Sequence, residues 1–167
     1  MEKINGRVRK FGDNIDTDTI TPGSILHLPI EEIRDHTFEP IFPGFSRTVK
    51  AGDVIVAGNN FGCGSSREQA TAVLKELGIR YVLCESMARI YFRNCIALGL
   101  YPIMAPGVSA IFSEGDEIEI DLEGGGLKNL GTRKTLRFKP LSGMTREIVE
   151  GGGILPVLKS LTEKNNT

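Results

Sequence analysis

The chain contains no tryptophan, only three cysteines and two histidines, and almost no net charge. Its 167 residues carry 20 Lys and Arg against 21 Asp and Glu, a formal net charge of −1. Such a balance offers no excess of positive charge to a phosphate backbone, and base stacking on tryptophan is excluded. No apolar run is long enough to cross a bilayer, and no N-terminal stretch is typical of a signal peptide. We therefore expect no nucleic-acid or membrane partner, and a cytoplasmic location.

The few cysteines also exclude two classes of site. Cys63, Cys84 and Cys95 are odd in number and lack C-x-x-C spacing, so they indicate neither a disulfide framework nor a self-contained metal site. Cys84 ends an expected strand and Cys95 lies on the apolar face of an expected helix, so we expect both to be buried as small hydrophobes. Cys63 has no His or Cys neighbour to activate it or share a metal, and we assign it no catalytic role.

The composition that remains is ordinary for a globular protein, with 40% apolar and 25% charged residues. This length normally forms one domain, here residues 1–167. Apolar patterning predicts strands alternating with helices, which is typical of a mixed, mostly parallel α/β sheet flanked by helices. The expected strands are residues 3–11, 54–57, 79–84, 101–104, 117–122 and 134–138; the expected helices are 70–77, 87–97 and one or two over 145–161.

Two segments read as less regular. Pro29, Pro40 and Pro43 break any long helix between residues 22 and 43, and we expect this segment to be mobile before a partner docks. The polar tail, residues 162–167, is expected to be frayed.

The most informative stretch is FGCGSSREQA, residues 61–70. It follows the apolar run 54–57 and opens a segment whose apolar residues have helical spacing, so a Gly-rich turn joins a strand to a helix. Such a turn leaves backbone N–H groups unpaired at the positive end of the helix dipole, where carboxylates bind well. Arg67 adds a fork that can hold a carboxylate through two hydrogen bonds. The stretch therefore indicates an acidic small-molecule ligand.

A purely structural interpretation of the same residues is also open. Ser65 with Glu68, or Ser66 with Gln69, fits the S-x-x-E/Q capping box, and the glycines could serve the turn alone. A cap needs one hydroxyl and no arginine, however, so the doubled serines and Arg67 favour a binding site.

A second polar loop, GDNIDTDTITPG over residues 12–23, contains three aspartates. The glycine and terminal glutamate of an EF-hand are missing at the required spacing, so we do not expect a calcium site or any other metal site here. The alternative that the residues alone allow is a solvated turn rich in Asx caps.

These motifs together carry a resemblance to a known family. Residues 61–70 resemble the swivel domain of the aconitase superfamily, specifically the separate small subunit of the 3-isopropylmalate dehydratases and their homoaconitase relatives. Residues 12–23 are similar to the family's N-terminal substrate loop, SMARIYFRNC (86–95) to its S-x-A-R-I-[FY]-x-R-N segment, and GGGILP (151–156) to its usual ending. The resemblance implies a swivelling β/β/α domain.

The activity that the resemblance implies is dehydration and rehydration of a hydroxy di- or tricarboxylic acid by a two-chain hydro-lyase. It assigns the base to Ser65, substrate-carboxylate contacts to Ser66 and Arg67, and further substrate contacts to Asp18 and Thr21. The implied partner is a large subunit that carries a [4Fe-4S] cluster, with no cofactor in this chain. The chain alone should be inert.

The resemblance also marks a specificity loop, and here the sequence departs from the family. Ile25 stands where a tyrosine is usual, followed by Leu26, His27 and Leu28, with His27 at or near the position that discriminates substrates. The apolar neighbours fit an isopropyl or methyl group, whereas a charged histidine would accept a third carboxylate; a plain surface histidine is the structural alternative. We expect 3-isopropylmalate, with 2,3-dimethylmalate and homoaconitate open.

Two further expectations concern partners. Arg89 and Arg93 are four residues apart on one helix face, which suggests ion pairing or docking to the large chain rather than catalysis. A function of another class, a non-catalytic regulatory or nucleic-acid-binding module with the same fold, is disfavoured by the charge balance and by the intact Ser65, Ser66 and Arg67.

Overall fold

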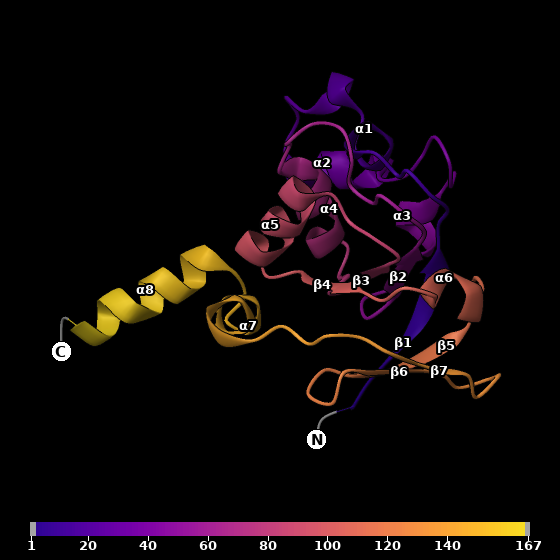
Figure 1. The fold of residues 1–167 in the computed structure, drawn as a ribbon. Helices are drawn as coiled ribbons and strands as arrows, with labels where there is room; N and C mark the ends of the chain where they lie inside the picture. The colour runs from indigo at the N-terminus through magenta and orange to yellow at the C-terminus, as the bar shows by residue number, and fades with distance from the viewer. Residues whose placement is uncertain (1–2, 166–167) are drawn as a thin grey trace.

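The computed structural model describes residues 3–165, and a seven-stranded sheet is their framework (Figure 1). The strand order is β4-β3-β2-β1-β5-β6-β7. Neighbours within β4 to β1 pair in parallel, and β5 to β7 continue the sheet beyond β1 in antiparallel fashion. The strands are β1 (Lys3–Lys10), β2 (Val54–Ala57), β3 (Tyr81–Cys84), β4 (Tyr101–Met104), β5 (Glu117–Asp121), β6 (Gly126–Asn129) and β7 (Thr135–Arg137).

The central strand β2 explains how the two faces are filled. All four of its side chains are buried, and they alternate between two hydrophobic clusters, with Ile55 and Ala57 in one and Val54 and Val56 in the other. A strand covered on both faces reads as a continuous apolar run. In β5, by contrast, isoleucines alternate with glutamates, and only the isoleucines are fully buried.

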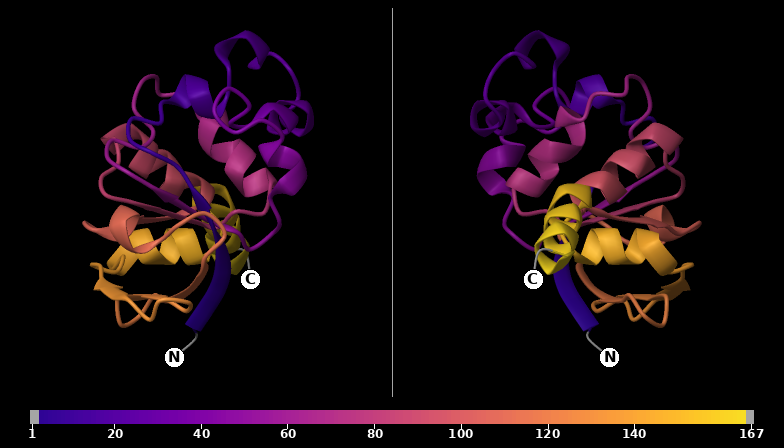
Figure 2. Two further views of the ribbon diagram at one scale, coloured as in Figure 1. Left: turned by 90° about the vertical axis from the view of Figure 1, so that its right-hand side faces the viewer. Right: turned by 90° about the vertical axis from the view of Figure 1, so that its left-hand side faces the viewer.

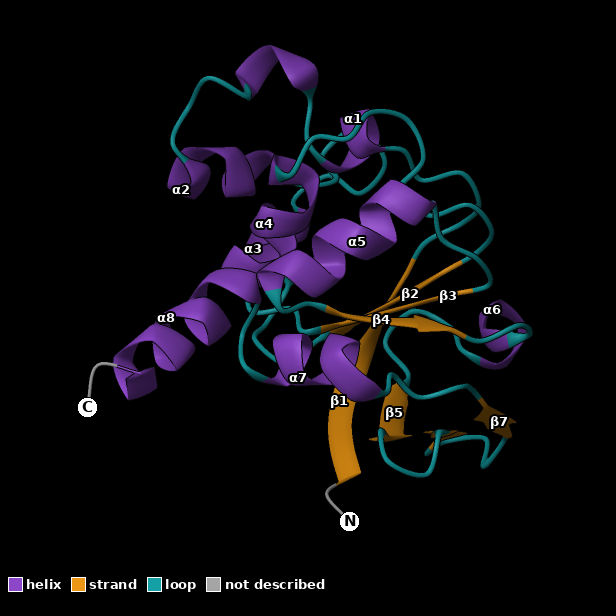
Figure 3. Cartoon of the chain, turned by 60° about the vertical axis from the view of Figure 1, so that its left-hand side comes forward, coloured by secondary structure: helices purple, strands orange, loops and turns teal. Residues whose placement is uncertain are grey.

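Helices cover both faces of the sheet (Figures 2 and 3). Residues of α4 (Gln69–Glu76) and α5 (Arg89–Leu98) join the first cluster, and residues of α6 (Val108–Ile111) and α7 (Gly143–Glu150) join the second. Short pieces connect β1 to β2: α1 (Thr17–Ile20), η1 (Gly23–Ile25), α2 (Ile30–Ile33), η2 (Arg34–His36) and α3 (Phe45–Thr48).

The last helix, α8 (Ile154–Asn165), projects from the body and buries none of its residues fully (Figures 1 and 3). Leu155, Leu158 and Leu161 are all more than half exposed. No helix among residues 3–165 is both long and apolar enough to cross a membrane.

The mixed α/β architecture with flanking helices is confirmed, and each of the six expected strands is present within a few residues of its expected bounds. Three details differ from the sequence interpretation. Residues 126–129, where no strand was expected, form β6. Residues 162–165 of the expected frayed tail are helical, while 166–167 lie outside the described residues. The segment 22–43 is anchored by Ile33 and Phe38 in the core. Its mobility before docking stays a prediction.

A buried ionic network ties the connection between β1 and β2 to the sheet. Arg9 is 2% exposed, and its guanidinium lies 4.9 and 4.8 Å from the ring centroids of Phe42 and Phe45. Its Nη1 donates to Oδ2 of Asp53 at 3.4 Å. Burial raises the pKa of Asp53, but hydrogen bonds from Arg7, Lys50 and Arg9 outweigh it and hold the pKa below its usual value.

Replacing Asp53 by alanine should lower the free energy of unfolding by about 2 kcal/mol, because Arg7 and Arg9 lose the buried carboxylate that they share and Arg9 keeps only Glu114 as an acidic partner within residues 3–165. The folded pKa of Asp53 is lowered, so its contribution is present above the unfolded pKa and is lost as pH falls through the folded pKa. Urea unfolding at pH 7 and at pH 3 should show a smaller difference between variant and wild type in acid.

The matched control is Asp35→Ala, whose carboxylate is 70% exposed and 3.8 Å from Arg34. It should change stability by less than about 0.5 kcal/mol at either pH. Equal effects of the two substitutions would contradict the role given to the buried network.

Candidate active site

The two polar loops predicted from the sequence lie against each other at the carboxyl end of β2. Residue 61 pairs with residue 87 and residue 16 with residue 63 in isolated parallel bridges. The Gly62 amide donates to the Ile15 carbonyl at 2.7 Å, and the Thr17 amide to the Cys63 carbonyl at 2.9 Å. In open α/β sheets, ligands bind where loops leave the carboxyl ends of parallel strands.

Glycine is required in this turn for two reasons. Gly62 has a φ of +75°, and a Cβ there would lie 2.1 Å from the ring of Tyr91. Gly64 has a φ of +98°, and a Cβ there would lie 3.2 Å from Oγ1 of Thr17. Left-handed backbone and close approach both favour glycine. The turn therefore brings the backbone at Ser65 directly onto the neighbouring loop.

The hydroxyl of Ser65 is held by two side chains. Nε of Arg67 donates to its Oγ at 2.7 Å, and Oγ1 of Thr17 lies 3.0 Å from the same atom. The Ser65 amide donates to Oγ1 of Thr17 at 3.1 Å. Ser65 itself is exposed, so its hydroxyl is open to a ligand while its position is fixed from behind.

Arg67 connects this turn to the aspartate-rich loop. Its Nη1 donates to Oδ1 of Asp18 at 3.0 Å and to the carbonyl of Thr21 at 2.9 Å. The Gly23 amide also donates to Oδ1 of Asp18. This backbone hydrogen bond, followed by the one from Arg67, holds the pKa of Asp18 below its usual value. Asp18 is therefore an anion at neutral pH, placed beside the arginine rather than alone.

The capping-box interpretation of the serines does not fit the geometry. Helix α4 begins at Gln69 with Glu68 in the N-cap position, and no side chain caps it. Ser65 and Ser66 thus precede the helix, and the carbonyl of Ser66 accepts a hydrogen bond from Nδ2 of Asn94 on α5. The Ser66 side chain is exposed beside that of Ser65.

Thr21 is placed differently from the other predicted site residues. It is 1% exposed, and its Oγ1 has no hydrogen-bond partner among the described residues. A buried hydroxyl without a partner is uncommon and costs free energy, so it is a group that a ligand or a rearrangement could satisfy.

The four residues of the specificity loop separate into two pairs. Ile25 and Leu28 pack against the first hydrophobic cluster. Leu26 is half-buried outside that cluster, and His27 is exposed. Of the four, Leu26 and His27 are therefore the side chains available to a ligand.

The cysteines follow the expectation for two of the three. Cys84 and Cys95 are buried, and burial raises the pKa of the Cys84 thiol to about 12. Cys63 is half-buried in the Gly-rich turn. Residues 3–165 contain no group of three or more His, Cys, Asp or Glu side chains that could hold a metal ion.

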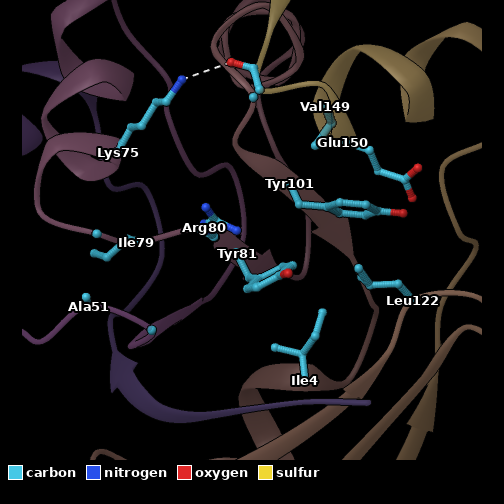
Figure 4. Close-up of a pocket in the computed structure, with 14 residues that line it drawn as sticks. Ile4, Ala51, Lys75, Ile79, Arg80, Tyr81, Tyr101, Leu122, Val149 and Glu150 are labelled. Atoms are coloured by element: carbon cyan, nitrogen blue, oxygen red, sulfur yellow. Dashed lines mark hydrogen bonds between the residues drawn. The ribbon is translucent and has the colours of Figure 1, made fainter. Parts of the chain in front are cut away.

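A cavity of about 740 Å³ lies at the opposite end of the parallel strands (Figure 4). Tyr81 and Tyr101, the first residues of β3 and β4, line it together with Lys75, whose Nζ donates to the carbonyls of Leu98 and Gly152. None of the predicted site residues lines this cavity.

Arg89 and Arg93 lie exposed on α5. They form no ion pair within the described part of the chain, so intramolecular pairing does not explain them.

Thr17 contacts Ser65 through its side chain, and sequence reasoning missed it as a site residue. Its only signal was its place in the same aspartate-threonine motif as Asp18 and Thr21.

Comparison with known proteins agrees with this geometry. The family model for the aconitase C-terminal domain matches residues 2–107. The isopropylmalate/citramalate isomerase small subunit of Methanocaldococcus jannaschii is 48% identical over 93% of this chain and 94% of its own length. The 3-isopropylmalate dehydratase small subunit 1 of Thermotoga maritima is also 48% identical, over 93% and 95%.

A homoaconitase relative and a solved structure are similar at the same level. The methanogen homoaconitase small subunit of Methanothermobacter thermautotrophicus is 47% identical over 91% of this chain and 88% of its own length. The crystal structure of a 3-isopropylmalate dehydratase from M. jannaschii superposes with a TM-score of 0.91 at 42% identity, covering 99% of this chain and 100% of that one. The chain therefore belongs to the aconitase C-terminal domain family, among the small subunits of the 3-isopropylmalate dehydratases and their homoaconitase relatives.

Proposed function

We propose that the chain is the small subunit of a two-chain hydro-lyase and supplies its catalytic base, Ser65. The observation that carries this proposal is the environment of Ser65 Oγ, an exposed hydroxyl that receives a hydrogen bond from Arg67 and lies beside the Thr17 hydroxyl. A structural serine needs neither a guanidinium nor an outward-facing position.

The chemistry requires a strong base. Dehydration of a hydroxy acid removes a proton from the carbon next to a carboxylate, and that proton is weakly acidic. A serine can accept it only as an alkoxide, whose negative charge must be stabilised by fixed donors and nearby positive charge. Nε of Arg67, 2.7 Å from Ser65 Oγ, supplies both.

A substrate carboxylate has a place to bind in the same arrangement. Arg67 uses Nε and Nη1 within the chain, whereas its Nη2 makes no hydrogen bond within residues 3–165. Ser66 presents an exposed hydroxyl next to it. Arg67 and Ser66 would hold the carboxylate, with Asp18 fixing the arginine and Thr21 Oγ1 gaining a partner if the loop shifts.

The partner in this proposal is a large subunit. The family resemblance assigns an iron–sulfur cluster to that subunit, and the cluster would assist the loss of the substrate hydroxyl. Among residues 3–165, no group of three or more His, Cys, Asp or Glu side chains could hold a metal ion. Exposed Arg89, Ile90 and Arg93 at the start of α5, near the Ser65 turn, would dock against the large subunit.

The proposed substrate is 3-isopropylmalate. Leu26 offers an apolar surface for the isopropyl group, and the similar small subunits named above include 3-isopropylmalate dehydratases. His27 is exposed next to Leu26, so an acid with a further carboxylate is the second candidate, and one relative is a homoaconitase subunit. The regulatory alternative has no observation in its favour.

Replacing Ser65 by alanine should lower kcat by about 10²- to 10⁴-fold, because the base is removed while the fold is unaffected. The measurement is anaerobic reconstitution with the cognate large subunit, followed by hydration of isopropylmaleate, dimethylmaleate, homoaconitate and the unsaturated acid derived from citramalate. Absorbance of the double bond reports each reaction.

Ser160→Ala, on the exposed face of α8, is the control and should match wild type. Wild-type activity on one acid, lost in Ser65→Ala alone, would support both base and substrate. A complex with an intact cluster that hydrates none of the acids would count against the proposed function.

Replacing Arg67 by lysine should lower kcat/KM by about 10- to 100-fold, since an ammonium cannot contact Ser65, Asp18 and the substrate at once. Arg80→Lys, in the distant cavity, keeps the same change of chemistry away from the site and should have no effect. If Arg67→Lys retained full activity, the simultaneous contacts of Arg67 with Ser65, Asp18 and the substrate would not be needed, and the role assigned to it would be wrong.

A further inference from the structure

We infer that Thr17 is a positioning residue for the base, holding Ser65 in its reactive rotamer and donating a hydrogen bond to its oxygen when the hydroxyl is ionised. This inference rests on the proposed function, because it concerns how Ser65 acts as a base. In this role Thr17 acts through Ser65, whose Oγ lies 3.0 Å from Thr17 Oγ1, and not on the substrate directly.

The placement of Thr17 leaves it few other partners. It is the first residue of α1 and is 2% exposed, so water cannot compete for its hydroxyl. Its amide is bound to the Cys63 carbonyl, which fixes its backbone to the turn that carries Ser65. The close approach of Gly64, which has no side chain, gives the Thr17 hydroxyl room to reach the turn.

The number of available protons decides which hydroxyl, that of Thr17 or that of Ser65, donates to the other in the ionised state. Oγ1 of Thr17 accepts a hydrogen bond from the Ser65 amide at 3.1 Å, and it lies 3.0 Å from Ser65 Oγ. While Ser65 keeps its proton, either hydroxyl can donate to the other. Once Ser65 is ionised, only Thr17 can donate, because the alkoxide has no proton left.

Thr17 and Arg67 therefore approach Ser65 Oγ with different roles. Arg67 is a charged donor that also binds Asp18, and its guanidinium can respond to the substrate. Thr17 is a neutral, buried donor on α1, and its two contacts with Ser65 fix both the backbone and the side chain of that residue. A preorganised donor of this kind stabilises charge without reorganisation during the reaction.

The competing explanation is that Thr17 only ties the two loops together. In that case, removal of the hydroxyl would loosen the whole site, and substrate binding would weaken along with catalysis. A positioning role for the base predicts a different result, namely a loss of kcat with KM nearly unchanged.

The test uses the reconstituted complex with isopropylmaleate, dimethylmaleate, homoaconitate and the unsaturated acid derived from citramalate. Thr17→Val, which keeps the shape and removes the hydroxyl, should lower kcat by about 10²-fold or more on the active acid, with KM changed less than about threefold. Thr17→Ser, which restores the hydroxyl, should recover kcat to within about fivefold of wild type. Thr19→Val, the same change on the same helix without a contact to Ser65, is the control.

Thermal unfolding and assembly with the large subunit are measured for each variant. If Thr17→Val fails to assemble, Thr17→Ala removes the same hydroxyl without placing a methyl group where the oxygen was, and it carries the same expectation. Wild-type kcat in the hydroxyl-free variant, a matching rise of KM, or a Thr17→Ser variant no better than Val would each overturn the inference. An inactive wild-type complex would instead overturn the proposed function, and the inference with it.

Discussion

The hydrogen bonds between residues 17–21 and residues 63–67 are the constraint on which the site depends. Two loops 48 residues apart in the sequence meet through Thr17 and Ser65, and Arg67 extends the contact to Asp18 and the carbonyl of Thr21. Neither loop has regular structure long enough to hold such a geometry by itself. The hydrogen bonds between the loops therefore hold the conformation of each.

The sheet makes this meeting possible. Parallel pairing of β1 with β2 places the ends of both strands at the same edge, so the loops that follow them emerge side by side. The packing of buried Arg9 against the rings of Phe42 and Phe45 then fixes the long connection between the two strands. Tyr91, on helix α5, packs against the Gly62 backbone, and its hydroxyl donates a hydrogen bond to the carbonyl of Ala70 on helix α4. These contacts link the turn to α4 and α5.

Much of this arrangement could be predicted from local pattern, and the exceptions have physical causes. The continuous apolar run of β2 and the alternation in β5 were sufficient signals, because burial alone decides them. β6 was missed because Gly124 to Gly126 reads as a turn and the strand is only four residues long. The specificity loop could not be resolved into Leu26 and His27 on one side and Ile25 and Leu28 on the other, because it has no regular period.

Within the site, Ser65, Ser66, Arg67 and Asp18 were predicted and do lie together, although the roles came from family resemblance and stay predictions. Thr17 could not be identified in this way. Its importance arises from a tertiary contact with Ser65, and its place in the aspartate-threonine motif does not distinguish it from the other threonines there. The burial of Thr21, with its unpartnered Oγ1, was equally invisible in the sequence.

The distribution of the three thiols has a practical consequence. Cys84 and Cys95 are sealed in the core, whereas Cys63 is partly accessible two residues from Ser65. A maleimide or iodoacetamide reagent applied to the folded chain would therefore react first at one position, inside the Gly-rich turn. The protein carries its own attachment point for a spectroscopic label, at the place where arrival of a ligand or a second chain would change the label's surroundings most.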